Sequence, residues 1–431
     1  MAITELRIQG LRTLADVRLS LRELTVLIGE NGSGKSSIIE ACELLRKAPS
    51  PDFLKEFRRT HWGFAGLLRH GAEQLKLGVR IEEDGQVFDY DFALAERAGQ
   101  VVIVEETLST GPDTLRPERL LILQRTDVSC HARNGVTGEL VNLTGPLLPL
   151  ALREGRLFVR VEKLEFNGVP LDSFFDVRPL QFLIDTNRRV ARALRSISVQ
   201  LPFETLPWWA SRSLKRPSAM REDNIVEPFE RLEPLGSNLG SAYFALRNDL
   251  GDAHWRETLE LIRLGLGEQV EDVLVKAGGD GGKISLRVKY RSQLQPVPTF
   301  ALSDGTLAYL AWVALYRAPR PEPPALLAFD EPELHLHPHL LMRVLDFLES
   351  LGQSSSVLVA THSDRLLDGL SRPAQQAVLC EVDARGQTQL RRPNQEALDR
   401  WMERYRGIGD LRSAGHDASI WSDDEPPAEK P

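Results

Sequence analysis

The sequence has few cysteines and lacks any long apolar run, and each shortage excludes a class of protein. Its three cysteines, Cys42, Cys130 and Cys380, stand far apart without paired spacing. This pattern argues against a disulfide framework or a cysteine-based zinc site and favours a reducing cytoplasm. No apolar stretch is long enough to span a bilayer, so we expect no membrane contact. The N-terminal residues also lack the charged start and apolar run of a signal peptide.

An excess of positive charge is absent as well. The 431 residues carry a formal net charge of -8, which disfavours nucleic-acid binding by the whole surface and leaves room only for a local basic patch. Hydrophobic residues make up 42% and charged residues 26%, ordinary values for a soluble globular chain of two or three domains. Sustained heptads and internal repeats are missing, so a long coiled-coil arm is not expected.

Hydrophobic periodicity predicts a mixed α/β chain. Residues 3–28 read as strands, and residues 74–108 read as antiparallel hairpins with a turn at Asp84-Gly85. Residues 178–270 have helical spacing, and the last third alternates between buried strands and amphipathic helices. The acidic, proline-rich residues 423–431 are expected to be disordered.

One glycine-rich stretch has a clear chemical meaning. Residues 29–36 read G-x-x-x-x-G-K-S, the Walker A phosphate loop, between an apolar run at Leu24–Ile28 and a helical pattern. Such a loop points backbone N–H groups at an anion, and the helix dipole adds to that field. Lys35 would reach the β- and γ-phosphates, and the Ser36 hydroxyl would ligate Mg²⁺. The predicted nucleotide-binding residues are Gly29, Glu30, Asn31, Gly32, Ser33, Gly34, Lys35, Ser36 and Ser37.

Polar residues follow two later buried strands. Asp330 and Glu331 end the apolar run Ala325–Phe329, as in a Walker B strand. Asp330 would hold Mg²⁺ and Glu331 would polarise the attacking water. His362 follows the next apolar run, and the carboxyl ends of such strands are where an open α/β sheet binds its ligand. We therefore predict that Glu331 and His362 are catalytic and that His362 touches the γ-phosphate.

A second anion-binding helix start precedes the Walker B strand. Residues 302–306 read L-S-D-G-T and lead into an apolar helix over residues 307–316. Two such helix starts and one metal site predict a shared nucleotide, with each subunit completing the site of the other.

The order of these motifs resembles that of an ABC-type ATPase head. The run at residues 330–338, D-E-P-E-L-H-L-H-P, is similar to the D-E-P-E-x-x-L-H-P of the SMC/RecF/OLD-like branch of bacterial "AAA-family" ATPases. The opening residues 6–13 also resemble the first strands of that family. The resemblance is close over residues 1–48 and 295–385 and loose between them.

The resemblance implies a fold, a cofactor and a partner. It implies a P-loop NTPase of the ABC-ATPase type, with a mixed β/α core and an inserted antiparallel-β and helical lobe. It also implies ATP and Mg²⁺, and a homodimer that sandwiches ATP, with Ser303 and Gly305 of one subunit on the γ-phosphate of the other. Gln124 and Gln181 are the candidates for the family's Q-loop glutamine. The expected parts are residues 1–48 (Walker A part of the core), 49–290 (insert), 291–390 (signature, Walker B and switch histidine) and 391–431 (C-terminal helix and tail).

Several functions share such an ATP site. We favour an ATP-hydrolysing, ATP-switched dimer in DNA repair or metabolism or in anti-phage defence, acting with a separate nuclease or toxin effector. The alternatives are the ATPase subunit of a membrane transporter and a non-hydrolysing ATP-dependent scaffold. The long separation between Ser36 and Leu302 disfavours a transporter subunit. The short segment after Ser363 leaves little room for a nuclease domain of the Toprim type within this chain.

The insert contains the best candidate for DNA contact, although a solvated helix face explains the same charges. Clustered cations bind phosphates and aromatic rings stack on bases. The candidates are Arg188, Arg189, Arg192, Arg195, Arg212, Lys215, Arg216 and Arg221, near Trp208-Trp209. The alternating His335, His337 and His339 suggest zinc by composition, but they match the structural loop of the family, so metal binding by them is not expected.

Overall fold

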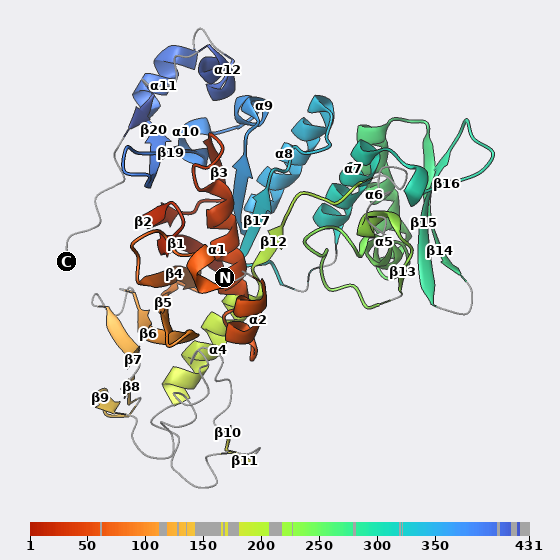
Figure 1. Ribbon diagram of the computed structural model, residues 1–431. Helices are drawn as coiled ribbons and strands as arrows, with labels where there is room; N and C mark the ends of the chain where they lie inside the picture. The colour runs from red at the N-terminus through yellow and green to blue at the C-terminus, as the bar shows by residue number, and fades with distance from the viewer. Residues whose placement is uncertain are drawn as a thin grey trace.

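A computed structural model gives the fold of the chain (Figure 1). It describes residues 1–60, 63–111, 119–126, 129–134, 136–142, 165–166, 169–170, 181–206, 218–225, 227–278, 282–318, 320, 322–402, 406–414 and 420–422.

A seven-stranded sheet forms the centre of the molecule. Its order is β12-β17-β18-β3-β19-β20-β21, and the first five strands are parallel. β3 and β18 are buried along their whole length, as their continuous apolar sequences predict. The strands are β3 (Leu24–Gly29), β12 (Ser198–Gln200), β17 (Leu326–Asp330), β18 (Ser356–Thr361), β19 (Ala377–Val382), β20 (Thr388–Pro393) and β21 (Trp421–Ser422).

Each face of this sheet is covered by a separate apolar core. Leu326 and Ala328 of β17 face the core that contains α1 (Lys35–Lys47). Leu327 and Phe329 face the core that contains α7 (Asp304–Arg317) and α8 (Pro338–Gly352). Because successive side chains of β17 point to opposite faces of the sheet, the end of this strand is held between the two apolar cores.

An eight-stranded antiparallel sheet packs on the far side of α1. Its order is β2-β1-β4-β5-β6-β7-β8-β9. The predicted hairpin turn at Asp84-Gly85 is confirmed, and both residues have the positive φ of a tight two-residue turn. The strands are β1 (Ala2–Leu11), β2 (Leu14–Ser20), β4 (Gln74–Glu83), β5 (Gln86–Arg97), β6 (Gln100–Thr110), β7 (Leu120–Thr126), β8 (Cys130–Arg133) and β9 (Leu140–Asn142).

The expected division at residue 48 does not follow the sheets. β4 pairs directly with β1 over most of its length, so the strands of the insert extend a sheet that the N-terminal residues begin. β12 also lies within the expected insert, yet it pairs with β17 in the central sheet. It follows α4 (Gln181–Arg195), which contacts α1. Helical periodicity over residues 178–270 obscured this three-residue strand.

The remaining insert forms a helical lobe beside α7 (Figure 1). Its helices pack against the β14–β15 hairpin through the same core that contains α7. It comprises β13 (Asn224–Ile225), α5 (Leu239–Asn248), α6 (Gly251–Leu266), β14 (Val270–Gly278), β15 (Lys283–Tyr290) and β16 (Val297–Pro298).

Short elements complete the chain. No helix in the described ranges is long and apolar enough to cross a membrane. The expected disordered tail, residues 423–431, lies outside the described residues. The short elements are α2 (Phe53–Thr60), β10 (Glu165–Phe166), β11 (Val169–Pro170), α9 (Asp364–Asp368), α10 (Pro373–Gln376), α11 (Gln395–Met402) and α12 (Ile408–Ser413), with 3-10 turns at Phe64–Gly66, Ala219–Arg221 and Thr299–Ala301.

Candidate nucleotide-binding site

The phosphate loop connects β3 to α1. Gly34 caps the helix with φ of 100°, and a Cβ there would lie 2.5 Å from Thr388 Oγ1, so only glycine fits. The Thr388 hydroxyl donates to the carbonyl of Ser33 at 2.9 Å. The start of β20 therefore packs directly against the phosphate loop and is hydrogen-bonded to it.

Lys35 lies inside the loop. Its Nζ donates to the carbonyls of Gly29 (2.8 Å) and Glu30 (2.9 Å) and to Ser33 Oγ (3.3 Å). The residue is 4% exposed, and burial lowers its pKa, whereas the nearby charges of Asp330 and Glu331 oppose that shift. The Lys35 ammonium is thus hydrogen-bonded to three uncharged oxygens. A negatively charged phosphate would attract it more strongly than they do.

Ser36 and Asp330 meet across the edge of the sheet. Ser36 Oγ donates to Asp330 Oδ1 at 3.2 Å, although 294 residues separate them. Burial raises the pKa of Asp330, and the charges of Glu331 and Glu333 raise it further. A hydroxyl and a crowded carboxylate at a helix N-terminus are the oxygen donors that Mg²⁺ prefers, so these two residues fit that ion.

Glu331 follows in a strained conformation. Its φ is 47°, in the left-handed region that side chains rarely adopt, and its N–H donates to the carbonyl of Ala360 at 2.8 Å. Its Oε1 lies 3.9 Å from His362 Nε2. Both side chains are a little over one-third exposed, so they face solvent at the carboxyl ends of β17 and β18.

Glu333 is a site residue that the sequence interpretation missed. Its Oε1 accepts from Thr361 Oγ1 at 2.6 Å and from the N–H of His362 at 2.8 Å. Its Oε2 is buried and has no hydrogen-bond partner. One carboxylate therefore ties the Walker B loop to the backbone of the switch histidine. Its position as the third acid of the D-E-P-E run was the available signal.

The signature segment forms the N-terminus of α7. Ser303 Oγ caps the helix by accepting from the N–H of Thr306 at 3.2 Å. A Cβ on Gly305 would lie 3.0 Å from the carbonyl of His335, so the signature turn is close to the Walker B loop of its own chain. The contacts of Ser303 are with its own helix turn, which leaves its role towards a nucleotide a prediction.

Neither Q-loop candidate is placed at this edge. Gln124 pairs with Thr107 in the eight-stranded sheet, and Gln181 donates to Asp185 at the start of α4. Gln200 ends β12 opposite Phe329, one residue before Asp330, but its side chain donates to the carbonyl of Leu232. The sequence interpretation missed this strand, and its apolar Ile197 and Val199 were the only signal.

The candidate DNA-binding residues divide into three groups. Arg189 and Arg192 of α4 pair with Glu83, and Arg188 pairs with Asp185, so α4 presents partly neutralised cations. Arg221 is buried and bonded to protein oxygens, which corrects its assignment as a DNA contact. Trp208, Trp209, Arg212, Lys215 and Arg216 lie outside the described residues.

The C-terminal helix α12 reaches the same edge. Arg412 donates to Asp364 at 2.9 Å, two residues after His362, and its charge acts on Lys35. A Cβ on Gly409 would lie 1.9 Å from the carbonyl of Asp364, so α12 packs backbone to backbone on α9. The segment after β20 is therefore part of the site and not merely an appendage.

Comparisons with known proteins agree with this site. Residues 1–89 match a family described as "AAA ATPase domain", and residues 174–368 match one described as "AAA domain, putative AbiEii toxin, Type IV TA system". No characterised protein sequence matches the chain.

Solved SMC head structures are also similar in outline. An SMC head bound to the C-terminal winged-helix domain of ScpA is 14% identical, covering 90% of this chain and 97% of that one, with a TM-score of 0.49. The SMC head of Thermotoga maritima is 14% identical, covering 90% and 98%, with a TM-score of 0.40. An SMC head bound to the C-terminal domain of ScpA, from Pyrococcus furiosus, is 13% identical, covering 93% and 98%, with a TM-score of 0.48.

The phosphate loop on a parallel sheet and the two family matches, which together lie over residues 1–89 and 174–368, indicate an ATPase of the AAA type. The order of Walker A, signature, Walker B and switch histidine defines it further. In the order of these motifs the chain resembles an ABC-type ATPase head of the SMC/RecF-like kind, and the matches to AAA ATPase families and the mixed α/β sheets bear out the predicted resemblance and fold class.

Proposed function

We propose that this chain binds and hydrolyses ATP with Mg²⁺ and works as an ATP-switched homodimer. The observation that carries the proposal is the meeting of Lys35, the Ser36–Asp330 pair and the Glu331–His362 pair at one edge of the central sheet. Phosphate loop, metal ligands, base and switch histidine are the parts that phosphoryl transfer requires.

Each residue has a role in this proposal. Lys35 and the N-terminus of α1 bind the phosphates, and Ser36 and Asp330 hold Mg²⁺. When bound, Mg²⁺ neutralises charge on the phosphates. Glu331 orients and deprotonates water, and His362 donates towards the γ-phosphate. Glu333 fixes the Walker B loop against the switch histidine.

The dimer follows from the place of the signature. Ser303 and Gly305 start a helix on the other side of the Walker B loop from the phosphate loop's own helix. A second subunit related by a two-fold axis would bring Ser303 and Gly305 to the γ-phosphate, and the interface would hold two shared sites. Loss of that phosphate on hydrolysis would loosen the contact.

Light scattering tests this dimer. Glu331→Gln should bind ATP without turning it over, and its mass should double when ATP is added. Glu331→Gln combined with Ser303→Arg should stay monomeric, because the arginine would block the interface by bulk. A mass independent of both ATP and Ser303 would contradict the shared site and leave a constitutive oligomer or a monomeric scaffold.

The setting that we propose is cytoplasmic, in DNA repair or metabolism or in anti-phage defence with a separate nuclease or toxin. Three buried free cysteines support a reducing compartment. The matched family description that names a toxin of a toxin–antitoxin system supports the defence setting. A membrane transporter subunit is the alternative for the same ATP site.

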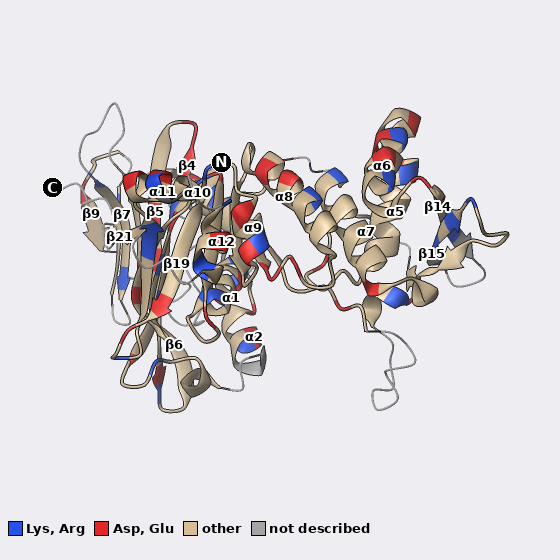
Figure 2. Cartoon of the chain, turned by 90° about the horizontal axis from the view of Figure 1, so that it is seen from above, with Lys and Arg blue, Asp and Glu red and all other residues tan. Residues whose placement is uncertain are grey.

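DNA contact through α4 is part of this proposal, although its charges are partly paired. In Figure 2 basic and acidic residues are interspersed on α6 and α8, whereas α4 carries four arginines within eight residues. Reversing Arg188, Arg189, Arg192 and Arg195 to Glu should abolish salt-sensitive DNA binding and spare ATP binding. Unchanged DNA binding would exclude α4.

A further inference from the structure

One buried arginine of the helical lobe joins two segments that border the nucleotide site. Arg221 ends a 3-10 turn, Ala219–Arg221, and its side chain is 2% exposed. Its guanidinium donates to four backbone carbonyls and one carboxylate. These are the carbonyls of Thr205 (2.7 Å), Thr299 (3.1 Å), Phe300 (3.2 Å) and Leu302 (2.8 Å), and Asp304 Oδ1 (2.5 Å).

Four of these acceptors lie in the segment that becomes the signature. Residues 299–304 pass from a 3-10 turn through two extended residues, Leu302 and Ser303, into α7, so their carbonyls have no regular ladder to join. A planar guanidinium offers five fixed donors and can satisfy several such carbonyls at once. Arg221 therefore sets the path of the backbone on which Ser303 and Gly305 are mounted.

The fifth acceptor connects the same arginine to the central sheet. Thr205 follows β12, the neighbour of the Walker B strand. In that connection Phe203 packs edge-on against Trp312 of α7 at 5.9 Å, and Trp312 lies 5.0 Å from Phe329 of β17. Arg221, the connection after β12 and α7 therefore form one packed unit that joins the Walker B strand to the signature.

We propose that Arg221 is a positioning residue that holds the L-S-D-G-T segment in the geometry required by the partner subunit's ATP. This inference rests on the proposed shared site. Arg221 touches no nucleotide of its own chain in this scheme. Its loss should therefore impair hydrolysis and dimerisation and leave ATP binding by Lys35 intact.

Two substitutions test the role of the arginine. Arg221→Met removes all five donors, and Arg221→Lys keeps a charge for Asp304 but cannot span the carbonyls. We expect the ATP-hydrolysis rate to fall about 10- to 100-fold in Arg221→Met and less in Arg221→Lys, with the Kd for ATP within about twofold of wild type. Arg247→Met, which removes a lobe arginine bonded to Asp272, is the matched control and should keep the wild-type rate.

Mixing variants separates positioning from misfolding. Lys35→Ala has a defective phosphate loop and an intact signature, whereas Arg221→Met should have the reverse. An equimolar mixture would form dimers with one complete composite site, so activity should rise above that of either variant alone. Because Arg221→Met supplies the working phosphate loop, this recovery also shows that the variant is folded.

The mixtures distinguish the two proposals. Ser303→Ala, which removes the Ser303 contact without adding bulk to the interface, should recover with Lys35→Ala if the site is shared at all. Recovery with Ser303→Ala but not with Arg221→Met would overturn the role of Arg221 and leave the shared site standing. Recovery with neither would overturn the shared site and the inference with it. In a dimer of Lys35→Ala with Glu331→Gln, each of the two composite sites carries one defect, so this mixture must stay inactive.

Discussion

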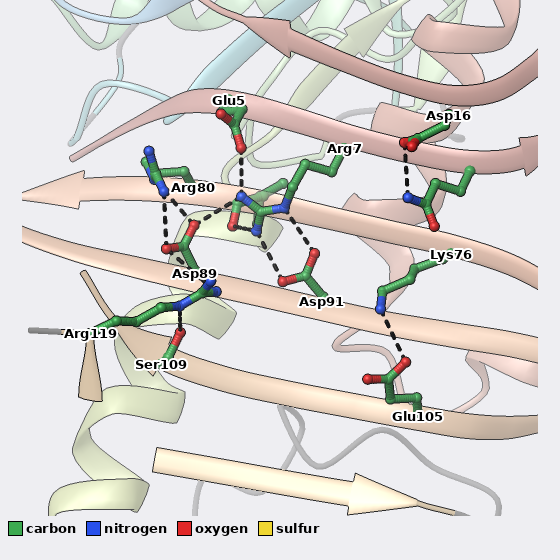
Figure 3. A network of polar contacts seen from close by, with 12 residues as sticks. Glu5, Arg7, Asp16, Lys76, Arg80, Asp89, Asp91, Glu105, Ser109 and Arg119 are labelled. Atoms are coloured by element: carbon green, nitrogen blue, oxygen red, sulfur yellow. Dashed lines mark hydrogen bonds and ion pairs between the residues drawn. The ribbon is translucent and has the colours of Figure 1, made fainter. Parts of the chain in front are cut away.

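Two clusters of charged side chains in this protein have opposite character. One lies on the open face of the eight-stranded sheet, and we call it the sheet-face network (Figure 3). The other is the nucleotide edge formed by Lys35, Asp330, Glu331, Glu333 and His362. The first consists of Glu5, Arg7, Lys76, Arg80, Asp89, Asp91, Glu105, Ser109 and Arg119.

The charges of the sheet-face network are closely paired. Arg7 donates to Glu5 (2.7 Å), to Asp89 (2.9 Å), to both oxygens of Asp91 and to the carbonyl of Val79. Asp89 is 1% exposed and also accepts from Arg80 at 3.2 Å. Burial would raise the pKa of Asp89, but its arginine partners hold it below the ordinary value.

The nucleotide edge leaves its acids only partly paired. Asp330, Glu331 and Glu333 crowd together, and the pKa of Asp330 is raised. Glu331 has a strained backbone, and a buried oxygen of Glu333 has no partner. A paired network stabilises a fold, whereas crowded and partly unpaired acids beside a phosphate loop mark a place where a ligand completes the structure. Substitutions in the nucleotide edge should therefore change ATP turnover, whereas substitutions in the sheet-face network should change the stability of the fold.

The largest effect is expected at Glu331. Glu331→Gln should lower the ATP-hydrolysis rate by about 10²- to 10⁴-fold, because the group that deprotonates water is lost. ATP binding and the melting temperature should stay near wild type. The control is Glu381→Gln on β19, an exposed acid that pairs with Arg391. A wild-type rate in Glu331→Gln would show that another residue is the base.

The sheet-face network should respond in stability instead. Asp89→Asn would remove the buried carboxylate that Arg7 and Arg80 share and should cost about 3 kcal/mol of unfolding free energy, although Arg7 keeps Asp91 and Glu5. Urea denaturation measures this loss, while ATP turnover per folded molecule should not change. A stable Asp89→Asn with impaired turnover would reverse the assignment of the two clusters.

The same carboxylate predicts the direction of acid sensitivity. The pKa of Asp89 is depressed in the folded state, so its contribution is complete above the ordinary value of 3.8 and is lost as pH falls through the lower folded value. The Asp89→Asn variant and the wild type should therefore converge in stability only at strongly acidic pH.

Sequence patterns predicted one cluster much better than the other. Walker A, the D-E pair and the strand before His362 are local, because a loop and its flanking strand specify the chemistry. The sheet-face network joins β1, β4 and β5 across long separations, so only strand register reveals that Arg7 faces Asp89 and Asp91. β12 was missed because three residues are too short for a period-two pattern.

Arg221 shows a further limit of sequence reasoning. In the sequence it is one cation among several near two tryptophans, and its burial depends on five acceptors from two distant segments. A cluster of charged residues in the sequence predicts an exposed surface. Only the packed structure shows that this guanidinium is buried and hydrogen-bonded inside the protein.

A smaller effect on turnover is expected at Glu333. Glu333→Gln keeps an acceptor for Thr361 but weakens the charged bonds that hold the switch backbone. We expect the rate to fall about 10-fold, since a hydrogen bond to a charged group contributes about 1.5–3 kcal/mol. Thr361→Val should give a similar fall if the role is positioning. A normal rate in both variants would show that the switch holds without this carboxylate.

The smallest effect is expected at Arg412, which sharpens the comparison because it is a paired charge inside the nucleotide edge. Its ion pair with Asp364 is partly exposed, so its removal should cost little stability. Its positive charge repels Lys35, however, and would attract a bound phosphate. Arg412→Met should therefore raise the KM for ATP about two- to fivefold, equivalent to about 0.5–1 kcal/mol, and leave the maximal rate almost unchanged.

The difference should shrink as salt concentration rises, because exposed charges are screened. Arg400→Met, which removes an exposed arginine from α11 of the same C-terminal segment, is the matched control and should keep the wild-type KM. A KM that is unchanged in Arg412→Met at low salt, or raised equally in both variants, would mean that α12 only packs against α9. A KM raised only in Arg412→Met would show that the charge on the C-terminal helix α12 contributes to phosphate binding.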